Sequence, residues 1–183
     1  MYSDRSDLSK YGLLEQRLLG GQVTRFHTRP DVGENQTVAE HTWRALVILN
    51  TLWPEASKNA WFYLLYHDIT EAELGDLPAT TKWKYPLLAK EYRKVESEYE
   101  KTLGIDSTFY PTYITDEDKS LCKMADMLEL VLHCYGKIQK GNTLARPIFE
   151  NGIAFLRNNF SKNPNFSPVE KVIQELENNE RKL

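Results

Sequence analysis

The sequence has little of what several classes of protein require. Only two of its 183 residues are cysteines, Cys122 and Cys134, so no disulfide framework is expected. No apolar run approaches the roughly 18 residues of a membrane-spanning helix, and the polar start MYSDRSDLSK is unlike a secretory signal peptide. Basic residues are not in excess: 23 Lys and Arg face 26 Asp and Glu, for a net charge of −3. We therefore expect a cytoplasmic protein that binds neither membranes nor nucleic acid.

Glycine and proline are also scarce, with 9 and 8 residues, and no stretch alternates apolar and polar residues as a half-buried strand does. Apolar residues instead recur with the period of an α-helix. The length suits one domain, since domains run to about 100–200 residues. The sequence predicts an all-α fold, a single domain over 1–183, with helices near 8–19, 37–53, 58–74, 86–103, 115–140, 144–160 and from 167 onward.

Three of these helices begin with a recognisable capping signal. Thr37 is followed three residues later by Glu40, which is the pattern of a capping box. Thr115 has Asp118 in the equivalent position. Ser167 is followed by a proline at the first helical position and by a glutamate three residues on. These signals predict helix starts at 37, 115 and 167.

Four side chains on the predicted helices could together hold a metal ion. They are His41, the adjacent pair His67 and Asp68, and Asp126. Two imidazoles and two carboxylates suit a borderline or hard divalent cation such as Mn, Fe, Co or Zn. Because His67 and Asp68 share one helix, the other two ligands must come from neighbouring helices, and a helical bundle with inward-pointing ligands can supply them.

The order His, then His-Asp, then Asp resembles the HD-domain metal-dependent phosphohydrolase superfamily. Longer blocks narrow the resemblance to one branch; they are Arg25-Phe26, ENQTVAEH at 34–41, YHDITE at 66–71, GDLP at 75–78 with Lys82, and KMAD at 123–126. These blocks are similar to the 5′-deoxynucleotidases and to their short phage relatives, which include dATP triphosphohydrolases. The resemblance implies an HD-type helical bundle with one divalent metal ion on three helices.

The resemblance also implies roles for five neighbouring residues. Glu71, one turn after the His-Asp pair, would orient or deprotonate the attacking water. Asp76 would hydrogen-bond the 3′-hydroxyl of the sugar. Arg25 would clamp a phosphate, and Lys82 is a further candidate phosphate contact. Phe26, which stands where the bacterial deoxynucleotidases usually carry Trp, would pack against the sugar or base.

The resemblance predicts an enzyme that cleaves the bond between the 5′-oxygen and the α-phosphorus of a 2′-deoxynucleotide. The compact length favours a dNTP triphosphohydrolase, in particular one for dATP, that releases triphosphate. The alternative is a 5′-deoxynucleotidase that acts on dNMPs and releases phosphate. Further alternatives are an alarmone pyrophosphohydrolase and a catalytically inert nucleotide-binding bundle. A homo-oligomer is expected as well, and His133 is interpreted as a packing residue rather than a ligand.

Overall fold

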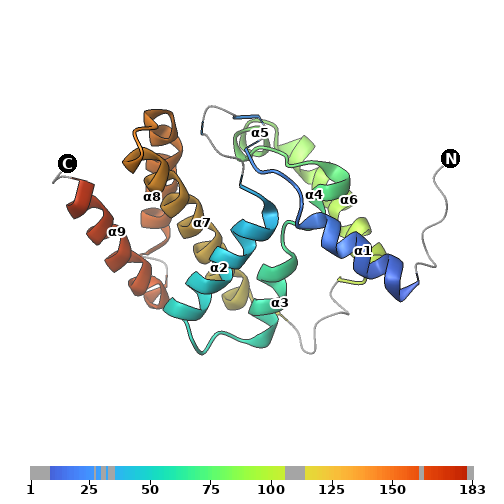
Figure 1. The fold of residues 1–183 in the computed structure, drawn as a ribbon. Coiled ribbons are helices and arrows are strands. Elements are labelled where there is room, and N and C mark those ends of the chain that lie inside the picture. The colour runs from blue at the N-terminus through green and yellow to red at the C-terminus, as the bar shows by residue number, and fades with distance from the viewer. Residues whose placement is uncertain are drawn as a thin grey trace.

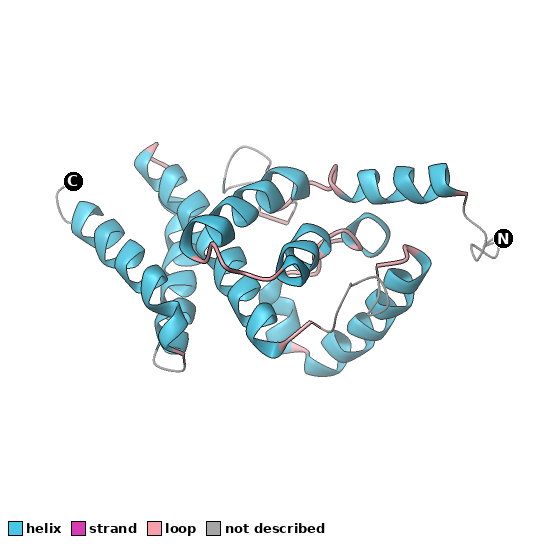
Figure 2. Ribbon diagram, turned by 90° about the horizontal axis from the view of Figure 1, so that it is seen from below, coloured by secondary structure: helices cyan, strands magenta, loops and turns pink. Residues whose placement is uncertain are grey.

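A computed structural model of the chain describes residues 9–26, 28–29, 32, 36–105, 114–160 and 163–180. The described part is helical throughout, and the elements follow the chain in this order: α1 (Lys10–Gly20), α2 (Val38–Leu52), α3 (Lys58–Tyr66), α4 (Glu71–Leu74), α5 (Ala79–Lys84), α6 (Pro86–Thr102), α7 (Asp116–Gln139), the 3₁₀ turn η2 (Thr143–Ala145), α8 (Arg146–Phe160), the 3₁₀ turn η3 (Pro164–Phe166) and α9 (Ser167–Glu180). Figure 2 shows no strand in this part, and its one β-type pairing is an isolated bridge between Thr24 and Thr37. The all-α prediction is confirmed.

The long helix α7 is the centre of the structure. It packs against α2, α3 and α8, and α9 covers α8 on the outside. Apolar residues on the inner faces of these helices form one continuous core, which includes Leu49, Leu64, Leu128 and Leu156, each at most 1% exposed. A much smaller cluster around Leu103 lies beneath α6. The helices that carry the predicted ligands therefore belong to the best packed part of the molecule.

The capping signals predicted the starts of α2 and α7. Thr37 accepts a hydrogen bond from the backbone N–H of Glu40 at the start of α2. At the start of α7 the capping box is complete: Thr115 accepts from the backbone N–H of Asp118, and the Asp118 carboxylate accepts from the backbone N–H of Thr115. These bonds satisfy N–H groups that have no partner inside the helix.

The predicted continuous helix over 58–74 is wrong, because α3 ends at Tyr66 and α4 begins at Glu71. The His67 Nδ1 atom lies 2.7 Å from the carbonyl oxygen of Leu64, an oxygen that a continuing helix would offer to the backbone N–H of Asp68. The backbone then tightens into bonds to the third preceding residue, such as Glu71 N–H to Asp68 O at 3.1 Å. Residues three apart stack on one side of such a turn. The broken helix therefore still places Glu71 on the same side as Asp68.

Three other boundaries differ from the prediction. The sequence predicted no helix between 74 and 86, yet residues 79–84 form α5. Ser167 has helical backbone angles and does not cap α9, because Asn163 accepts a hydrogen bond from the backbone N–H of Asn165 and starts the turn η3 earlier. Leu8, the first residue of the first predicted helix, lies outside the described residues, and α1 is capped by Ser9. The cap at Asn163 competes with the predicted cap at Ser167, and the sequence pattern at Ser167 does not reveal this competition.

The end of α1 touches the turn between α3 and α4. Gly20, the last residue of α1, is buried against Ile69, and a side chain there would collide with the Ile69 backbone as well as its side chain. Only glycine allows this approach. The contact packs the end of α1 against the turn between α3 and α4.

Candidate metal centre and active site

The four predicted ligands converge at one point where α2, α3 and α7 meet. The Nε2 atom of His41 lies 3.1 Å from Asp126 Oδ1 and 3.7 Å from Asp68 Oδ2. The Nε2 atom of His67 lies 3.2 Å from Asp68 Oδ2 and 3.9 Å from Asp126 Oδ1. The donor atoms of His41, His67 and Asp68 all fall within 4.8 Å of one another. A single ion could contact all four side chains.

The donor atoms are free to bind such an ion. Nε2 of His41 and Nε2 of His67 are buried and have no hydrogen-bond partner. Buried polar atoms in this condition are rare, because each one costs about 1–3 kcal/mol. An arrangement of two imidazole nitrogens and two carboxylates fits a divalent cation, which would satisfy both nitrogens at once.

The electrostatics of the centre favour positive charge. Burial alone would raise the carboxyl pKa values, but His67 and Arg25 hold the pKa of Asp68 well below its usual range, and Lys123 and His41 do the same for Asp126. Burial opposes protonation of His67, yet Asp68 and Asp126 outweigh it and raise the pKa of His67 to about 9. Two ionised carboxylates are therefore held together in a buried position that attracts a cation.

Both histidines are oriented by a second hydrogen bond on the far side of the ring. Nδ1 of His67 faces the carbonyl oxygen of Leu64, and Nδ1 of His41 lies 2.6 Å from Oε2 of Glu129. An acceptor at Nδ1 keeps a proton on that nitrogen, so Nε2 is the nitrogen that faces a metal ion. The ring orientation is thus determined by the protein and not by the ion alone.

Glu129 was missed by the sequence reasoning. It lies one turn after Asp126 on α7, is 0% exposed, and accepts from Gln36 Nε2 at 2.8 Å and from Arg44 Nε at 2.7 Å in addition to His41. The sequence offers one signal, since Glu129 is the only charged residue in the apolar run MLELVL. A carboxylate there must be paired, because an isolated buried charge is expensive.

Glu71 lies beside the centre, as the sequence predicted. Its Oε2 atom is buried without a hydrogen-bond partner. Burial, together with the negative charges of Asp68 and Asp76, raises the pKa of Glu71 to about 8. The side chain is therefore poised to exchange a proton near neutral pH.

Arg25 and Phe26 approach from the loop that precedes α2. Arg25 Nη1 lies 3.6 Å from Asp68 Oδ2 and is a buried donor without a hydrogen bond. Phe26 has φ = +57°, an uncommon conformation for a residue with a side chain. Its ring stacks on His133, with centroids 5.3 Å apart and planes 15° apart. His133 is 8% exposed and packs against the Phe26 ring.

The remaining predicted contacts surround the opening of the site. Lys82, on α5, lines a cavity of about 330 Å³ together with His67, Asp68 and Asp126. The Lys82 ammonium also lies over the Tyr92 ring, 5.4 Å from its centroid. Asp76 is half-buried in the loop after α4, close enough to Glu71 to raise its pKa. Lys82 and Asp76 thus lie near the candidate metal centre without contacting it.

An all-α bundle with His, His-Asp and Asp on neighbouring helices is the arrangement of the HD-domain phosphohydrolases, which act with a divalent metal. The chain belongs to the YfbR-like 5′-deoxynucleotidase family, whose family model matches residues 23–167. The match includes every predicted site residue.

Curated relatives agree with this assignment. The chain is 33% identical over 103 residues to the 5′-deoxynucleotidase yfbR of Photorhabdus temperata, which is 49% of this chain and 52% of that protein. It is 33% identical over 88 residues to a 5′-deoxynucleotidase of Vibrio parahaemolyticus, 43% of this chain and 45% of the relative. A 5′-deoxynucleotidase of Yersinia pseudotuberculosis is 31% identical over 103 residues, 49% of this chain and 52% of the relative. The chain thus matches about half the length of these relatives.

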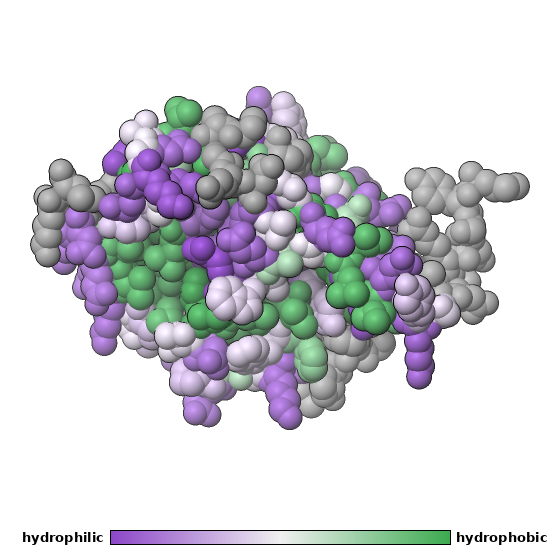
Figure 3. All heavy atoms as spheres, viewed as in Figure 1, coloured by the Kyte–Doolittle hydropathy of each residue, from purple (hydrophilic) through white to green (hydrophobic). Residues whose placement is uncertain are grey.

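Two expectations from the sequence concern the surface of the protein: that it does not bind membranes and that it forms a homo-oligomer. Within the described part, no helix combines the length and apolar character needed to cross a bilayer. Several apolar side chains are nevertheless exposed on α2 and α3, namely Trp43, Val47 and Leu65, and on α1, namely Tyr11, Leu14 and Leu18. Figure 3 shows hydrophobic residues exposed among hydrophilic ones on one face of the molecule. The homo-oligomer stays a prediction.

Proposed function

We propose that the protein is a metal-dependent 5′-deoxynucleotidase that hydrolyses 2′-deoxynucleoside 5′-monophosphates to deoxynucleoside and phosphate. One observation carries the proposal: four buried side-chain atoms without hydrogen-bond partners, on Arg25, His41, His67 and Glu71, gather around two ionised carboxylates. Such a site can bind a cation and an anion together and can exchange a proton. These three properties suit the hydrolysis of a phosphate ester.

His41, His67, Asp68 and Asp126 would hold the metal ion, for which Mn, Co, Zn and Fe are the candidates. A divalent cation in that position supplies Lewis-acid activation of water and of a phosphoryl oxygen. Glu129 and the carbonyl of Leu64 keep the two imidazoles in the orientation that binding requires.

The other site residues would act on the substrate and the water. Arg25, whose Nη1 has no hydrogen bond, would bind the phosphate, with Lys82 as a further phosphate contact. Glu71 would orient the attacking water and take its proton. As the water oxygen bonds to phosphorus, the bond from phosphorus to the 5′-oxygen breaks, and that oxygen receives the proton that Glu71 took from the water. Asp76 would accept a hydrogen bond from the 3′-hydroxyl, and the ring of Phe26 would pack against the 2′ side of the sugar.

The relatives favour the monophosphate over the triphosphate that the chain's length suggested, because those reported above are all named 5′-deoxynucleotidases. A dNTP triphosphohydrolase remains the second candidate for one structural reason. The cavity at the metal centre is lined by four cationic side chains, Lys82, Arg93, Lys119 and Lys123. Lys123 pairs with Asp126, and the other three could contact a longer phosphate chain.

The test is a product assay with purified, metal-loaded protein on dAMP, dATP and their ribonucleotide counterparts. We expect phosphate from dAMP, little product from AMP, and no triphosphate from dATP. Rejection of the ribonucleotide follows from an aromatic ring that leaves an added 2′-hydroxyl without room or partner. Asp126→Ala, which removes one ligand and its charge, should abolish both metal content and turnover. Triphosphate release from dATP would favour the second candidate, and equal rates on dAMP and AMP would contradict deoxynucleotide selectivity.

A further inference from the structure

Six buried side-chain atoms in the described part of the chain lack a hydrogen-bond partner. Four belong to the candidate active site. The other two are Oε1 of Gln36 and Nε2 of His133, and both residues line a different cavity. Gln36 is 1% exposed and His133 is 8% exposed, so bulk water does not readily satisfy either atom. Two such atoms in one cavity indicate a ligand that the proposed hydrolysis does not use.

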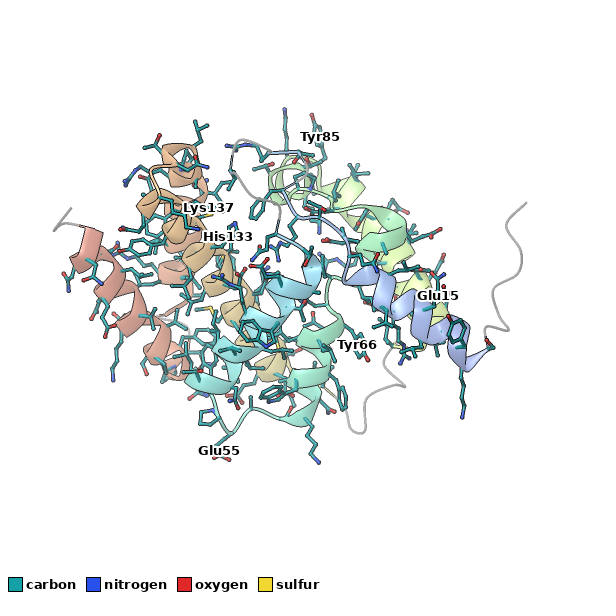
Figure 4. The ribbon with its side chains drawn as sticks, in the orientation of Figure 1. Glu15, Glu55, Tyr66, Tyr85, His133 and Lys137 are labelled. Carbon is teal, nitrogen blue, oxygen red and sulfur yellow. The ribbon has the colours of Figure 1, made fainter. Side chains whose placement is uncertain are left out.

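This second cavity, of about 210 Å³, is lined by residues of α2 and α7 together with Gln36. Three cationic side chains line it, Arg44, Lys137 and Lys140, against one carboxylate, Glu40. Figure 4 labels His133 and Lys137, which lie one turn apart on α7. The cavity is therefore positively charged around its two unpaired polar atoms.

The cavity is distinct from the one at the metal centre, and the two have no lining residue in common. Glu129 lies between them. On one side it contacts His41, and on the other it contacts Gln36 and Arg44. Glu129 therefore separates the second cavity from the metal ligands, and the two sites approach each other at Phe26, the proposed sugar contact, whose ring stacks on His133.

The polar atoms restrict the chemistry of the ligand. Gln36 donates its amide N–H to Glu129, so its Oε1 offers the cavity an acceptor that requires a donor on the ligand. Burial, together with nearby Lys137 and Arg44, lowers the pKa of His133 to about 4, so its imidazole is neutral at pH 7. Arg44 already pairs with Glu129, and Lys137 and Lys140 add positive charge that favours an anion. An anion that also carries a hydroxyl fits both conditions.

We propose that this cavity is a second anion site, which binds inorganic phosphate or the phosphate group of a small hydroxylated monoester. The hydrogen phosphate dianion has both features the cavity needs. Its charged oxygens suit Arg44, Lys137 and Lys140, and its P–OH group can donate to Gln36. In a monoester, a hydroxyl on the carbon skeleton supplies the donor instead. His133 completes the site through Nε2.

The test follows the His133 side chain directly, by its imidazole ¹⁵N resonance in the full-length, zinc-loaded protein. Inorganic phosphate is titrated in one arm and glycerol 3-phosphate in the other. Lys137→Glu combined with Lys140→Glu reverses the charge of the cavity. Lys58→Glu combined with Lys171→Glu is the matched control, because both lysines are exposed on other helices and line neither cavity.

We expect a saturable shift of the His133 resonance, with a midpoint that rises at least about tenfold in the Lys137 and Lys140 variant and stays unchanged in the control. Tighter binding of inorganic phosphate identifies the free anion as the ligand, and tighter binding of glycerol 3-phosphate identifies a monoester. An unshifted resonance in both arms, or equal midpoints in the two double variants, overturns the proposal. Since no turnover is measured, a failure of the proposed nucleotidase activity does not affect the result.

Discussion

Two halves of the molecule differ in how densely their side chains are packed. The half built from α2, α3, α7, α8 and α9 encloses one large core, with many side chains that are completely buried. Among the residues that the structure describes, the half built from α4, α5 and α6 has only the small cluster of Ile69, Leu103 and Ile105, and none of the 17 residues of α6 is buried. Tyr92 on α6 donates to the carbonyl oxygen of Gly75, which is one of the polar contacts that hold this half together.

The proposed roles divide along the same line, except for Arg25 and Phe26, which precede α2 and lie beside the packed half. His41 and Asp126 lie on helices of the packed half, where surrounding side chains fix their positions. Glu71, Asp76 and Lys82 lie in the thinly packed half. Segments with few buried contacts open at low free energy, and substrate-binding elements are commonly drawn from them. A metal site needs fixed ligands, whereas substrate contacts can tolerate movement that lets substrate enter and product leave.

The sharpest test of this division is Glu71→Gln. Gln keeps the shape of the side chain but cannot take a proton, so kcat should fall by about 10²–10⁴-fold. Metal content should stay at the wild-type value, because the four proposed ligands are untouched. Turnover and metal content are measured in the same preparation, with Glu98→Gln as the control, since Glu98 is exposed on α6 and does not line the cavity. Normal turnover with normal metal would mean that Glu71 does not handle the proton.

The difference in packing predicts that truncation of a leucine to alanine lowers the free energy of unfolding more in the packed half than in the thinly packed half. Leu156→Ala in α8 removes a fully buried side chain and should lower the free energy of unfolding by about 2–5 kcal/mol. Leu87→Ala in α6, where the side chain is 80% exposed, should change it by no more than about 0.5 kcal/mol. Denaturant unfolding of both variants measures the difference. Similar losses in the two would show that α6 packs as tightly as α8.

A smaller effect is expected from Glu129→Gln in the packed half. The amide is a weaker acceptor for His41 Nδ1–H, so metal affinity should fall by about 10–100-fold, and excess metal should restore most of the turnover. Competition with a metal-binding indicator gives the affinity, and a thermal melt in the same buffer separates it from loss of fold. Unchanged affinity would assign Glu129 a purely structural role with Gln36 and Arg44.

Local chemistry in the sequence was enough to predict much of this protein. Thr37 and Thr115 predicted helix starts because a cap bonds to backbone only a few residues away. The helical period of apolar residues predicted an all-α fold. His41, His67, Asp68 and Asp126 stood out because their residue types and order resemble a known metal-binding family.

Tertiary structure decided the features that depend on residues distant in the chain. Glu129 holds His41 from 88 positions away, and no local pattern records which acceptor a buried imidazole will find. The break after Tyr66 depends on how the His67 ring turns back to Leu64 while Gly20 packs against Ile69. Gln36 and His133 face one cavity only because the loop before α2 lies against α7. An unpaired polar atom is costly, and so marks a site, only where it is buried. That burial exists only once the helices have packed.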